Sequence, residues 1–374
     1  MQCSRCGQKH DLARLQPGQR ALCVRCGSVL AERGWAGPAS AFVFGLTALV
    51  LAIPAFALPL VTLRKFGNAR VSFLDTSFSG LWSHDYQVLA TWVLFCGALA
   101  PVVMLGLVVA LRRMDPTAMP RLNSWLRATA DQMEYWSTPE VQLLGILVAF
   151  FKLGDLVDVT VNAGLICFGA MAFFALLAWR AFSLQAPTGT APPRSEAESV
   201  ASPSRSRLAE VTALTIAAVI LLFPAYALPV MHLGIAGHPT SDTTIFTGIQ
   251  QLWRQGLGVL AAIVFTASFL VPLLKLAALT VLLVSAHRGA RGRGRLLTHL
   301  YGMIDFIGRW SMLDVFLVAF LVGAVQFGKL ASVRPDVGIL AFAAVVVLTM
   351  LATRRFDPRV LWIGSGVGRA AVTG

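Results

Sequence analysis

Eight apolar runs dominate the sequence, and they limit the folds open to this chain more than any other feature. They lie near residues 41–61, 88–111, 141–151, 161–179, 211–230, 257–284, 315–327 and 337–350. Most reach, with their flanks, the length of about 20 residues that a helix needs to span a bilayer. Charged residues make up only 13% of the chain, against roughly 25% in soluble domains. We therefore predict an all-α integral membrane protein with eight transmembrane helices.

The distribution of basic residues predicts how these helices are oriented. If the N-terminus is cytoplasmic, roughly three quarters of the 31 Lys and Arg residues fall in cytoplasmic segments, where such residues are enriched. We therefore expect both termini in the cytoplasm. The net charge of +13 then reflects topology and attraction to anionic lipid headgroups. A nucleic-acid partner is not expected, because the arginines lie in short loops between spans. The polar first 40 residues lead us to expect no signal peptide.

Two Cys-x-x-Cys motifs near the N-terminus predict a metal site. They are formed by Cys3 with Cys6 and by Cys23 with Cys26, and each is followed by a glycine that permits a tight turn. Four thiolates at this spacing can surround zinc tetrahedrally, and iron is the less favoured alternative. Disulfides are not expected in the reducing cytoplasm. Because so small a segment cannot bury an adequate core, the metal would supply its folding energy.

Matching proline pairs indicate an internal duplication. Pro54 and Pro59 lie in "IPAFALP", and Pro224 and Pro229 lie in "FPAYALP". Four spans in each half make both halves insert the same way up, as in parallel repeats. The predicted division is a four-cysteine zinc ribbon at 1–34, a four-helix repeat at 35–183, a flexible cytoplasmic linker at 184–207 and a second four-helix repeat at 208–374. The prolines themselves indicate either packing kinks or a cavity near the outer half of the bilayer.

Two charged residues within spans are candidates for function. Lys275 lies well inside the sixth span, where a lysine costs about 2.5–3.5 kcal/mol on insertion scales. Asp314 lies about one turn into the seventh span. The two either form a polar pair facing the bundle interior, or Lys275 snorkels to the headgroups while Asp314 caps a helix. The first repeat has Met104 in place of Lys275 and Glu140 in place of Asp314, so we expect the second repeat to be the working half.

In these features the chain resembles the paraquat-inducible protein A family, also called the intermembrane transport protein A family, over nearly its whole length. The resemblance is carried by the Cys-x-x-Cys pairs, the proline pairs and the segments "FTG…LW", "VPLLKL" and "WSMLDVF". It implies a bacterial inner-membrane protein that works with mammalian-cell-entry (MCE) domain tunnel proteins and carries phospholipid. Many relatives have a second four-cysteine set before the second unit, whereas the linker here contains no cysteine.

The resemblance and the residues together predict a transport mechanism rather than an enzyme. The sequence contains no phosphate-binding loop, no nucleophile elbow and no paired catalytic carboxylates. We expect lipid to enter a cleft between broken helices and pass to or from the tunnel protein, with Lys275 and Asp314 as a polar switch. The predicted cleft residues are Pro54, Pro59, Pro224, Pro229, Trp82 and Trp253. The alternatives are a secondary transporter of a small solute and a membrane thiol or iron redox protein.

Overall fold

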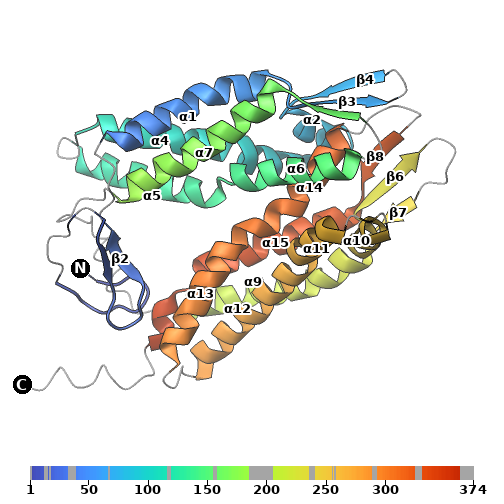
Figure 1. Cartoon of the computed structure of the whole chain (residues 1–374). Helices are drawn as coiled ribbons and strands as arrows, with labels where there is room; N and C mark the ends of the chain where they lie inside the picture. The colour runs from blue at the N-terminus through green and yellow to red at the C-terminus, as the bar shows by residue number, and fades with distance from the viewer. Residues whose placement is uncertain are drawn as a thin grey trace, which may run out of the picture.

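The computed structural model describes most of the chain. The described residues are 2–11, 16, 18–32, 39–65, 68–115, 119–154, 158–184, 205–235, 241–254, 256, 258–288, 293–324 and 331–362. Residues 40–184 form a first half and residues 205–362 a second half, which lie side by side (Figure 1). A small ribbon lies at one end of the molecule and short strands lie at the other, and we call these the ribbon end and the sheet end. The predicted linker lies almost entirely outside the described residues.

The two halves contain the same order of α-helices, strands and π-helical turns, and the second half has two 3-10 turns in addition. The first half consists of α1 (Ser40–Ala57), β3 (Val61–Lys65), β4 (Asn68–Ser72), α2 (Thr76–Trp82), α3 (Gln87–Leu94), the π-helical turn η1 (Phe95–Leu99), α4 (Ala100–Arg113), α5 (Pro120–Trp136), α6 (Pro139–Gly154), β5 (Asp158–Val161) and α7 (Ala163–Leu184). The second half consists of α9 (Arg205–Ala227), β6 (Met231–Ile235), β7 (Ser241–Thr243), α10 (Ile245–Arg254), α11 (Gly258–Phe265), the π-helical turn η2 (Thr266–Leu270), α12 (Val271–Arg288), α13 (Gly294–Gly308), the 3-10 turn η3 (Arg309–Met312), α14 (Leu313–Ala324), β8 (Ala331–Pro335), α15 (Val337–Arg355) and the 3-10 turn η4 (Pro358–Trp362).

The helices fit a membrane protein, as predicted, although the predicted number of spans is not reached. Seven stretches of the described chain are long and apolar enough to cross a membrane. One of them, Gly294–Ala324, joins α13, η3 and α14. Helix α6 has only 16 residues and falls short of this length. The count of eight spans therefore stays a prediction.

Two small antiparallel sheets at the sheet end were missed by the sequence analysis. Each sheet has three strands, in the order β4-β3-β5 in the first half and β7-β6-β8 in the second. In β3, Val61 and Leu63 are buried while Arg64 is exposed, which is the period-two pattern of a half-buried strand. The third strand of each sheet arrives from a distant part of the chain, immediately before the last helix of its half. Each sheet therefore joins the beginning of its half to the end.

The second proline of each pair ends a helix. Pro54 and Pro224 lie inside α1 and α9, but these helices end at Ala57 and Ala227, before Pro59 and Pro229. The prediction that both prolines lie within a broken helix is therefore wrong for the second one. The reason is local, because a residue that precedes proline disfavours helical backbone angles. Leu58 is accordingly extended, with φ −94° and ψ 149°.

The carbonyl groups of these second prolines hold the two ends of each half together. The Pro59 carbonyl accepts a hydrogen bond from the Gly164 backbone N–H at 3.1 Å, and Pro229 accepts one from Gly338 at 3.1 Å. A Cβ atom at either glycine would lie 2.4 Å from the proline oxygen. Both glycines are therefore required by close backbone contact between the first and last helices of a half.

Helix α14 forms the centre of the contact between the two halves. It packs mainly against α2 and α6 of the first half, and nearly all of its described side chains are buried. Its closest contact is made by Gly323, where a Cβ atom would lie 2.0 Å from the Thr76 carbonyl oxygen. A Cβ atom on Gly80 of α2 would likewise lie 2.6 Å from the Cα atom of Gly323. The two helices therefore touch backbone to backbone.

Candidate functional site

The four N-terminal cysteines come together as the sequence predicts. Their Sγ atoms all lie within 4.8 Å of one another, and all four residues are buried. Cys3 Sγ is 3.7 Å from Cys26 Sγ, and Cys6 Sγ is 3.4 Å from Cys23 Sγ. Tetrahedral zinc–sulfur bonds of about 2.3 Å place sulfur atoms about 3.8 Å apart. The four thiols therefore fit a tetrahedral metal ion, although the identity of the metal stays a prediction.

Two similar backbone turns place these thiols. In each turn, a glycine N–H bonds to the carbonyl of the first cysteine, from Gly7 to Cys3 at 2.9 Å and from Gly27 to Cys23 at 2.8 Å. Gly7 and Gly27 have φ angles of +77° and +76°, which non-glycine residues rarely adopt. This confirms the predicted role of the two glycines. Strands β1 (Arg20–Leu22) and β2 (Val29–Glu32) pair antiparallel beside the second turn.

The pKa values of Cys3, Cys6 and Cys26 shift in different directions, because their surroundings stabilise the thiolate to different degrees. Burial raises the pKa of Cys6 and of Cys26. Burial also acts to raise the pKa of Cys3, but hydrogen bonds from Ser28 and from backbone N–H groups outweigh it and lower this pKa to about 6. Ser28 Oγ lies 3.3 Å from Cys3 Sγ and 3.0 Å from Cys26 Sγ. Because the ligands of a metal ion must be deprotonated, metal binding here releases protons.

Elemental analysis of the purified protein is expected to find one zinc ion per chain. Replacing a ligand in Cys23→Ser should remove the metal, because three thiolates and a hydroxyl bind zinc far more weakly than four thiolates. Cys167→Ser is the matched control, since Cys167 lies in α7 and is a free, half-buried thiol. A coloured, iron-containing protein would contradict the zinc prediction and would favour the redox alternative.

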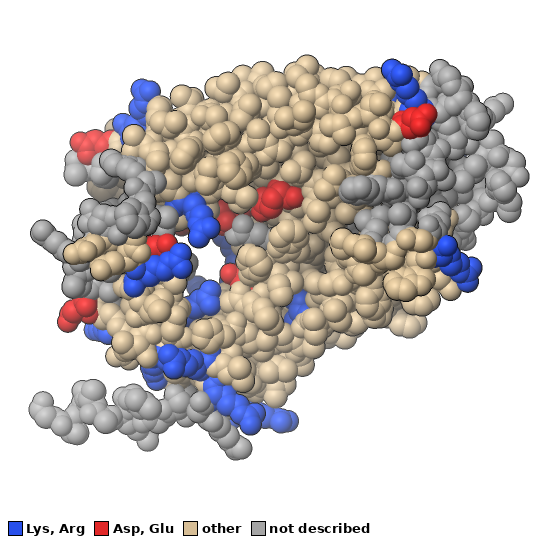
Figure 2. All heavy atoms as spheres, viewed as in Figure 1, with Lys and Arg blue, Asp and Glu red and all other residues tan. Residues whose placement is uncertain are grey.

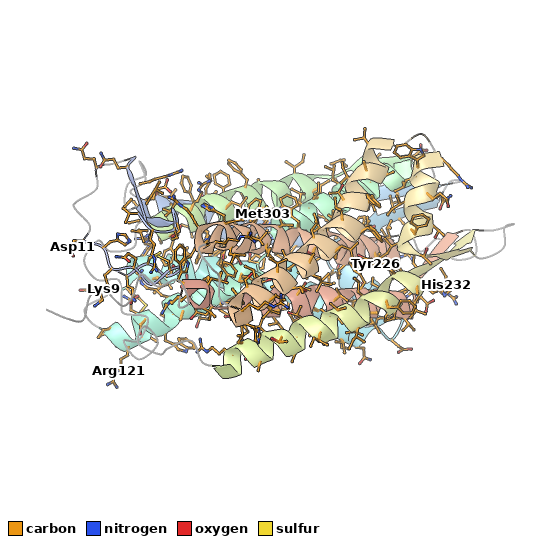
Figure 3. The ribbon with its side chains drawn as sticks, turned by 90° about the horizontal axis from the view of Figure 1, so that it is seen from below. Lys9, Asp11, Arg121, Tyr226, His232 and Met303 are labelled. Atoms are coloured by element: carbon orange, nitrogen blue, oxygen red, sulfur yellow. The ribbon has the colours of Figure 1, made fainter. Side chains whose placement is uncertain are left out.

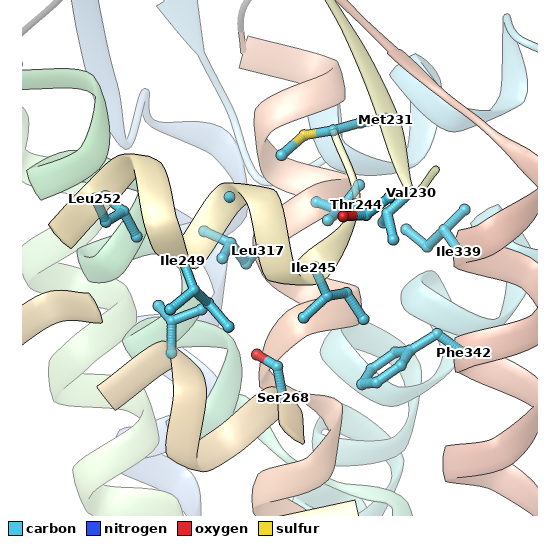
Figure 4. Close-up of a pocket in the computed structure, with 13 residues that line it drawn as sticks. Val230, Met231, Thr244, Ile245, Ile249, Leu252, Ser268, Leu317, Ile339 and Phe342 are labelled. Carbon is cyan, nitrogen blue, oxygen red and sulfur yellow. The ribbon is translucent and has the colours of Figure 1, made fainter. Parts of the chain in front are cut away.

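A second candidate site is an apolar cavity in the second half, close to the sheet end (Figure 4). Its volume is about 50 Å³. The walls come from α10, α14, α15, the turn η2 and the start of β6, and include Met231, Ile245, Ile249, Leu252, Leu317 and Phe342. Two residues with hydroxyl groups line this space, Thr244 and Ser268. The Ser268 side chain is fully buried, and its Oγ has no hydrogen-bond partner among the described residues.

A turn of π-helix places Ser268 in the cavity wall. Turn η2 precedes Pro272, and the corresponding turn η1 precedes Pro101 in the first half. Such turns leave carbonyl groups without regular helical partners and are frequent at functional sites. The Tyr226 hydroxyl donates to the carbonyls of Ser268 and Phe269 at 3.2 and 3.3 Å. The sequence analysis did not identify Ser268. The one feature that could have indicated it is its position within an apolar span, four residues before Pro272.

A larger apolar groove lies on the other side of α10. It has a volume of about 360 Å³ and runs between α10 and α11. Ile249 lines both the groove and the cavity, so α10 separates the two spaces. Trp253 lines the groove and is 67% exposed, and its place at the mouth of a lipid cleft stays a prediction. The other predicted cleft residues line neither space in the described part of the chain: Pro54, Pro59, Pro224, Pro229 and Trp82.

Lys275 lies buried in the second half. Its side chain is 3% exposed, and its Nζ has no hydrogen-bond partner among the described residues. It lies against α13, where a Cβ atom on Gly308 would be 3.2 Å from Nζ. The side chain of Asp314 lies outside the part of the chain that the structure describes. The Lys275–Asp314 pair therefore stays a prediction.

The chain is similar to proteins named for transport across the cell envelope. The family model described as PqiA, paraquat-inducible protein A, matches residues 39–186 and again residues 208–364. The intermembrane transport protein PqiA of Escherichia coli (strain K12) is 30% identical over 96% of this chain and 94% of its own length. The lipophilic envelope-spanning tunnel protein A of the same strain is 27% identical over 98% of this chain and 92% of its own length. No solved structure matches.

Proposed function

Because this chain belongs to the paraquat-inducible protein A family, we propose that it is the inner-membrane component of an intermembrane lipid transport system. The cargo in this proposal is phospholipid, and the partner is an MCE-domain tunnel protein in the periplasm. The names of the relatives point to transport between membranes and to an envelope-spanning tunnel. They favour a transport protein over an enzyme.

The observation that carries the proposal is the pair of apolar spaces on the two sides of α10. The groove is lined almost wholly by apolar side chains, and it shares Ile249 with the cavity. An acyl chain is a suitable occupant of such spaces, because its burial needs apolar contact and no hydrogen bonds. Movement of α10 would join the groove to the cavity. In this proposal an acyl chain of the lipid lies in the groove beside Trp253, and the cavity next to Ser268, at about 50 Å³, takes part of that chain only after α10 has moved.

The charge distribution supports an orientation with the sheet end in the periplasm. Lys and Arg side chains gather at the ribbon end in Figure 2, where the positive-inside rule places the cytoplasm. Figure 3 shows Lys9, Asp11 and Arg121 toward this end and His232 at the opposite end. A cytoplasmic ribbon end also keeps the four thiols reduced, as metal binding requires. The cavity and the groove, both lined by α10 at the sheet end, then lie toward the periplasm, where a tunnel partner would receive lipid.

Lipid mass spectrometry of the protein purified in mild detergent tests the proposal. The wild-type protein is expected to retain phospholipid enriched over the bulk membrane. Ala262→Trp should lower that enrichment several-fold, because Ala262 lines the groove and is exposed, so a large ring can fill the space without disturbing the core. Ile166→Trp is the matched control, since Ile166 is a 70% exposed apolar residue of α7 in the first half. Lipid that matches the bulk membrane in all three proteins would contradict lipid binding at this site.

A secondary transporter of a small solute is the second candidate. It is favoured by Lys275, a buried cation within a span, since such residues mark substrate or ion pathways. This candidate predicts saturable uptake of a soluble substrate into vesicles that contain the protein alone. The lipid proposal predicts no such uptake.

A further inference from the structure

The four-cysteine ribbon precedes the first half in the sequence, but it rests on the second half (Figure 1). Its surface contacts α13 and η4 at the ribbon end. The Arg359 guanidinium donates to the Ser4 carbonyl at 3.4 Å. The side chains of Arg295 and His299 lie beside Gly27. The ribbon therefore connects the beginning of the first half with the last elements of the second.

An arginine from each Cys-x-x-Cys turn makes the main contact. Arg5 and Arg25 occupy the same position of the two turns, directly before the second cysteine. The Arg5 guanidinium lies 5.7 Å from the centre of the Tyr301 ring, and the Arg25 guanidinium lies 4.6 Å from the centre of the Trp362 ring. Both distances are within the range of cation–π attraction. The two turns that hold the metal ligands therefore also hold the docking residues.

A glycine on α13, Gly302, leaves space for the side chain of Arg5. A Cβ atom on Gly302 would lie 2.4 Å from Arg5 Nη1. Gly302 follows Tyr301 and lies two turns after Arg295 on the same helix. The face of α13 that carries these residues is thus shaped to receive the ribbon.

Trp362 links the metal centre to α13. Its ring packs against the buried cluster of the four cysteines, together with Leu30. Its indole N–H donates to Thr298 Oγ1 at 3.1 Å, and its ring lies 3.1 Å from the position of a Cβ atom on Gly294. A ribbon of about 30 residues is too small to bury a core of its own. The second half therefore supplies part of the apolar cover of the metal site.

We infer that the metal-loaded ribbon is a clamp on the second half, and that metal binding and docking onto α13 and η4 are coupled. Metal binding supplies the folding free energy of such ribbons, so the turns that present Arg5 and Arg25 depend on the metal. Coupling of this kind is reciprocal, so docking must in turn slow metal loss. In this inference, loss of the metal releases α13 from its contacts with the ribbon. Helix α13 directly follows α12, the helix that contains Lys275. The inference does not rest on the cargo.

Metal release from the full-length protein into a zinc-chelating dye tests this coupling. Trp362→Ala and Gly302→Leu are expected to release zinc about tenfold faster than the wild type, the effect of losing one desolvated cation–π contact. Gly302→Leu fills the space that Arg5 occupies and leaves the ribbon sequence intact. The controls are Phe223→Ala, an 80% exposed aromatic residue near the sheet end of α9, and Gly106→Leu, where a Cβ atom meets nothing within 4 Å. Equal release rates in all these proteins would overturn the inference.

Hydrogen exchange measured with and without metal tests the reciprocal effect. After the zinc is removed by a chelator, amide exchange should accelerate in α13 and η4 as well as in the ribbon. Helix α4 of the first half serves as the internal control region and should keep its exchange rate. Acceleration confined to the ribbon would show that it is not a clamp and would overturn the inference. Neither measurement depends on lipid transport.

Discussion

Gly323→Leu is expected to prevent stable association of the two halves. A Cβ atom at this position would lie 2.0 Å from the Thr76 carbonyl oxygen, and backbone cannot move aside as a flexible side chain can. Extra atoms in a well-packed core lower the free energy of unfolding by about 1–3 kcal/mol. A clash with the backbone should cost at least the upper value of this range. Total stabilities are only about 5–15 kcal/mol. We therefore expect a large loss of folded protein rather than a small shift.

Fluorescence-detected size-exclusion chromatography with a thermal ramp measures this effect. The Gly323→Leu protein should elute as aggregate, or should melt far below the wild type. Gly106→Leu provides the comparison, since it makes the same substitution in helix α4, where nothing lies within 4 Å of the new Cβ atom. A Gly323→Leu protein with a normal elution profile and melting temperature would show that α2 and α14 do not meet as described.

Features that depend on neighbouring residues were predictable from the sequence. The four cysteines and the two following glycines belong to short turns whose geometry follows from local spacing, so the convergence of the four thiols was predicted correctly. The ends of α1 and α9 could also have been predicted from neighbouring residues, because Leu58 and Leu228 precede proline and therefore disfavour helical backbone angles. The sequence analysis treated both prolines of a pair alike and overlooked this signal.

Features that depend on distant residues were not predictable. Trp362 packs against the cysteine cluster although nearly the whole chain separates them in sequence, and no local sequence pattern indicates that contact. The pairing of β3 with β5 and of β6 with β8 likewise joins segments far apart in the sequence. Gly80 and Gly323 appear in the sequence as ordinary small residues of apolar helices. Only the fold shows that each is required by the backbone of the other helix.

The two halves share their element order but differ at the residues that line the candidate site. Tyr226 donates to the carbonyls of turn η2, whereas the corresponding residue in "IPAFALP" is Phe56, which has no hydroxyl. Ser268 corresponds to Gly97, and Lys275 corresponds to Met104. A Cβ atom on Gly97 would lie 2.4 Å from Gln142 Oε1, so a side chain of α6 occupies this place in the first half. The two halves therefore place different polar groups at corresponding positions, Ser268 and Lys275 in the second half and Gln142 in the first, and the role of the second as the working half stays a prediction.

Lys275→Met is expected to abolish transport and to raise the melting temperature. Met104 is buried at the corresponding position of the first half, so this helix environment accepts a methionine. Lys275 is buried with no hydrogen-bond partner among the described residues, and a lysine at the centre of a span costs about 2.5–3.5 kcal/mol on insertion scales, so an apolar side chain of similar size should stabilise the protein. An ionisable residue within a membrane span is by default a candidate for function, so we expect the cost of Lys275 to be offset by a role in transport.

Two measurements on the same proteins separate these effects. Lipid transfer from proteoliposomes to acceptor vesicles, with the proposed tunnel partner present, should be lost in Lys275→Met and kept in Leu274→Met. Leu274 is the matched control because it is the adjacent residue of α12 and is 57% exposed. A thermal ramp should show Lys275→Met more stable than the wild type. Lower stability would show instead that Lys275 has a partner, and Asp314→Asn should then cause a similar loss. Full transport by Lys275→Met at normal abundance would contradict the polar switch, because the change removes the only titratable group of that side chain.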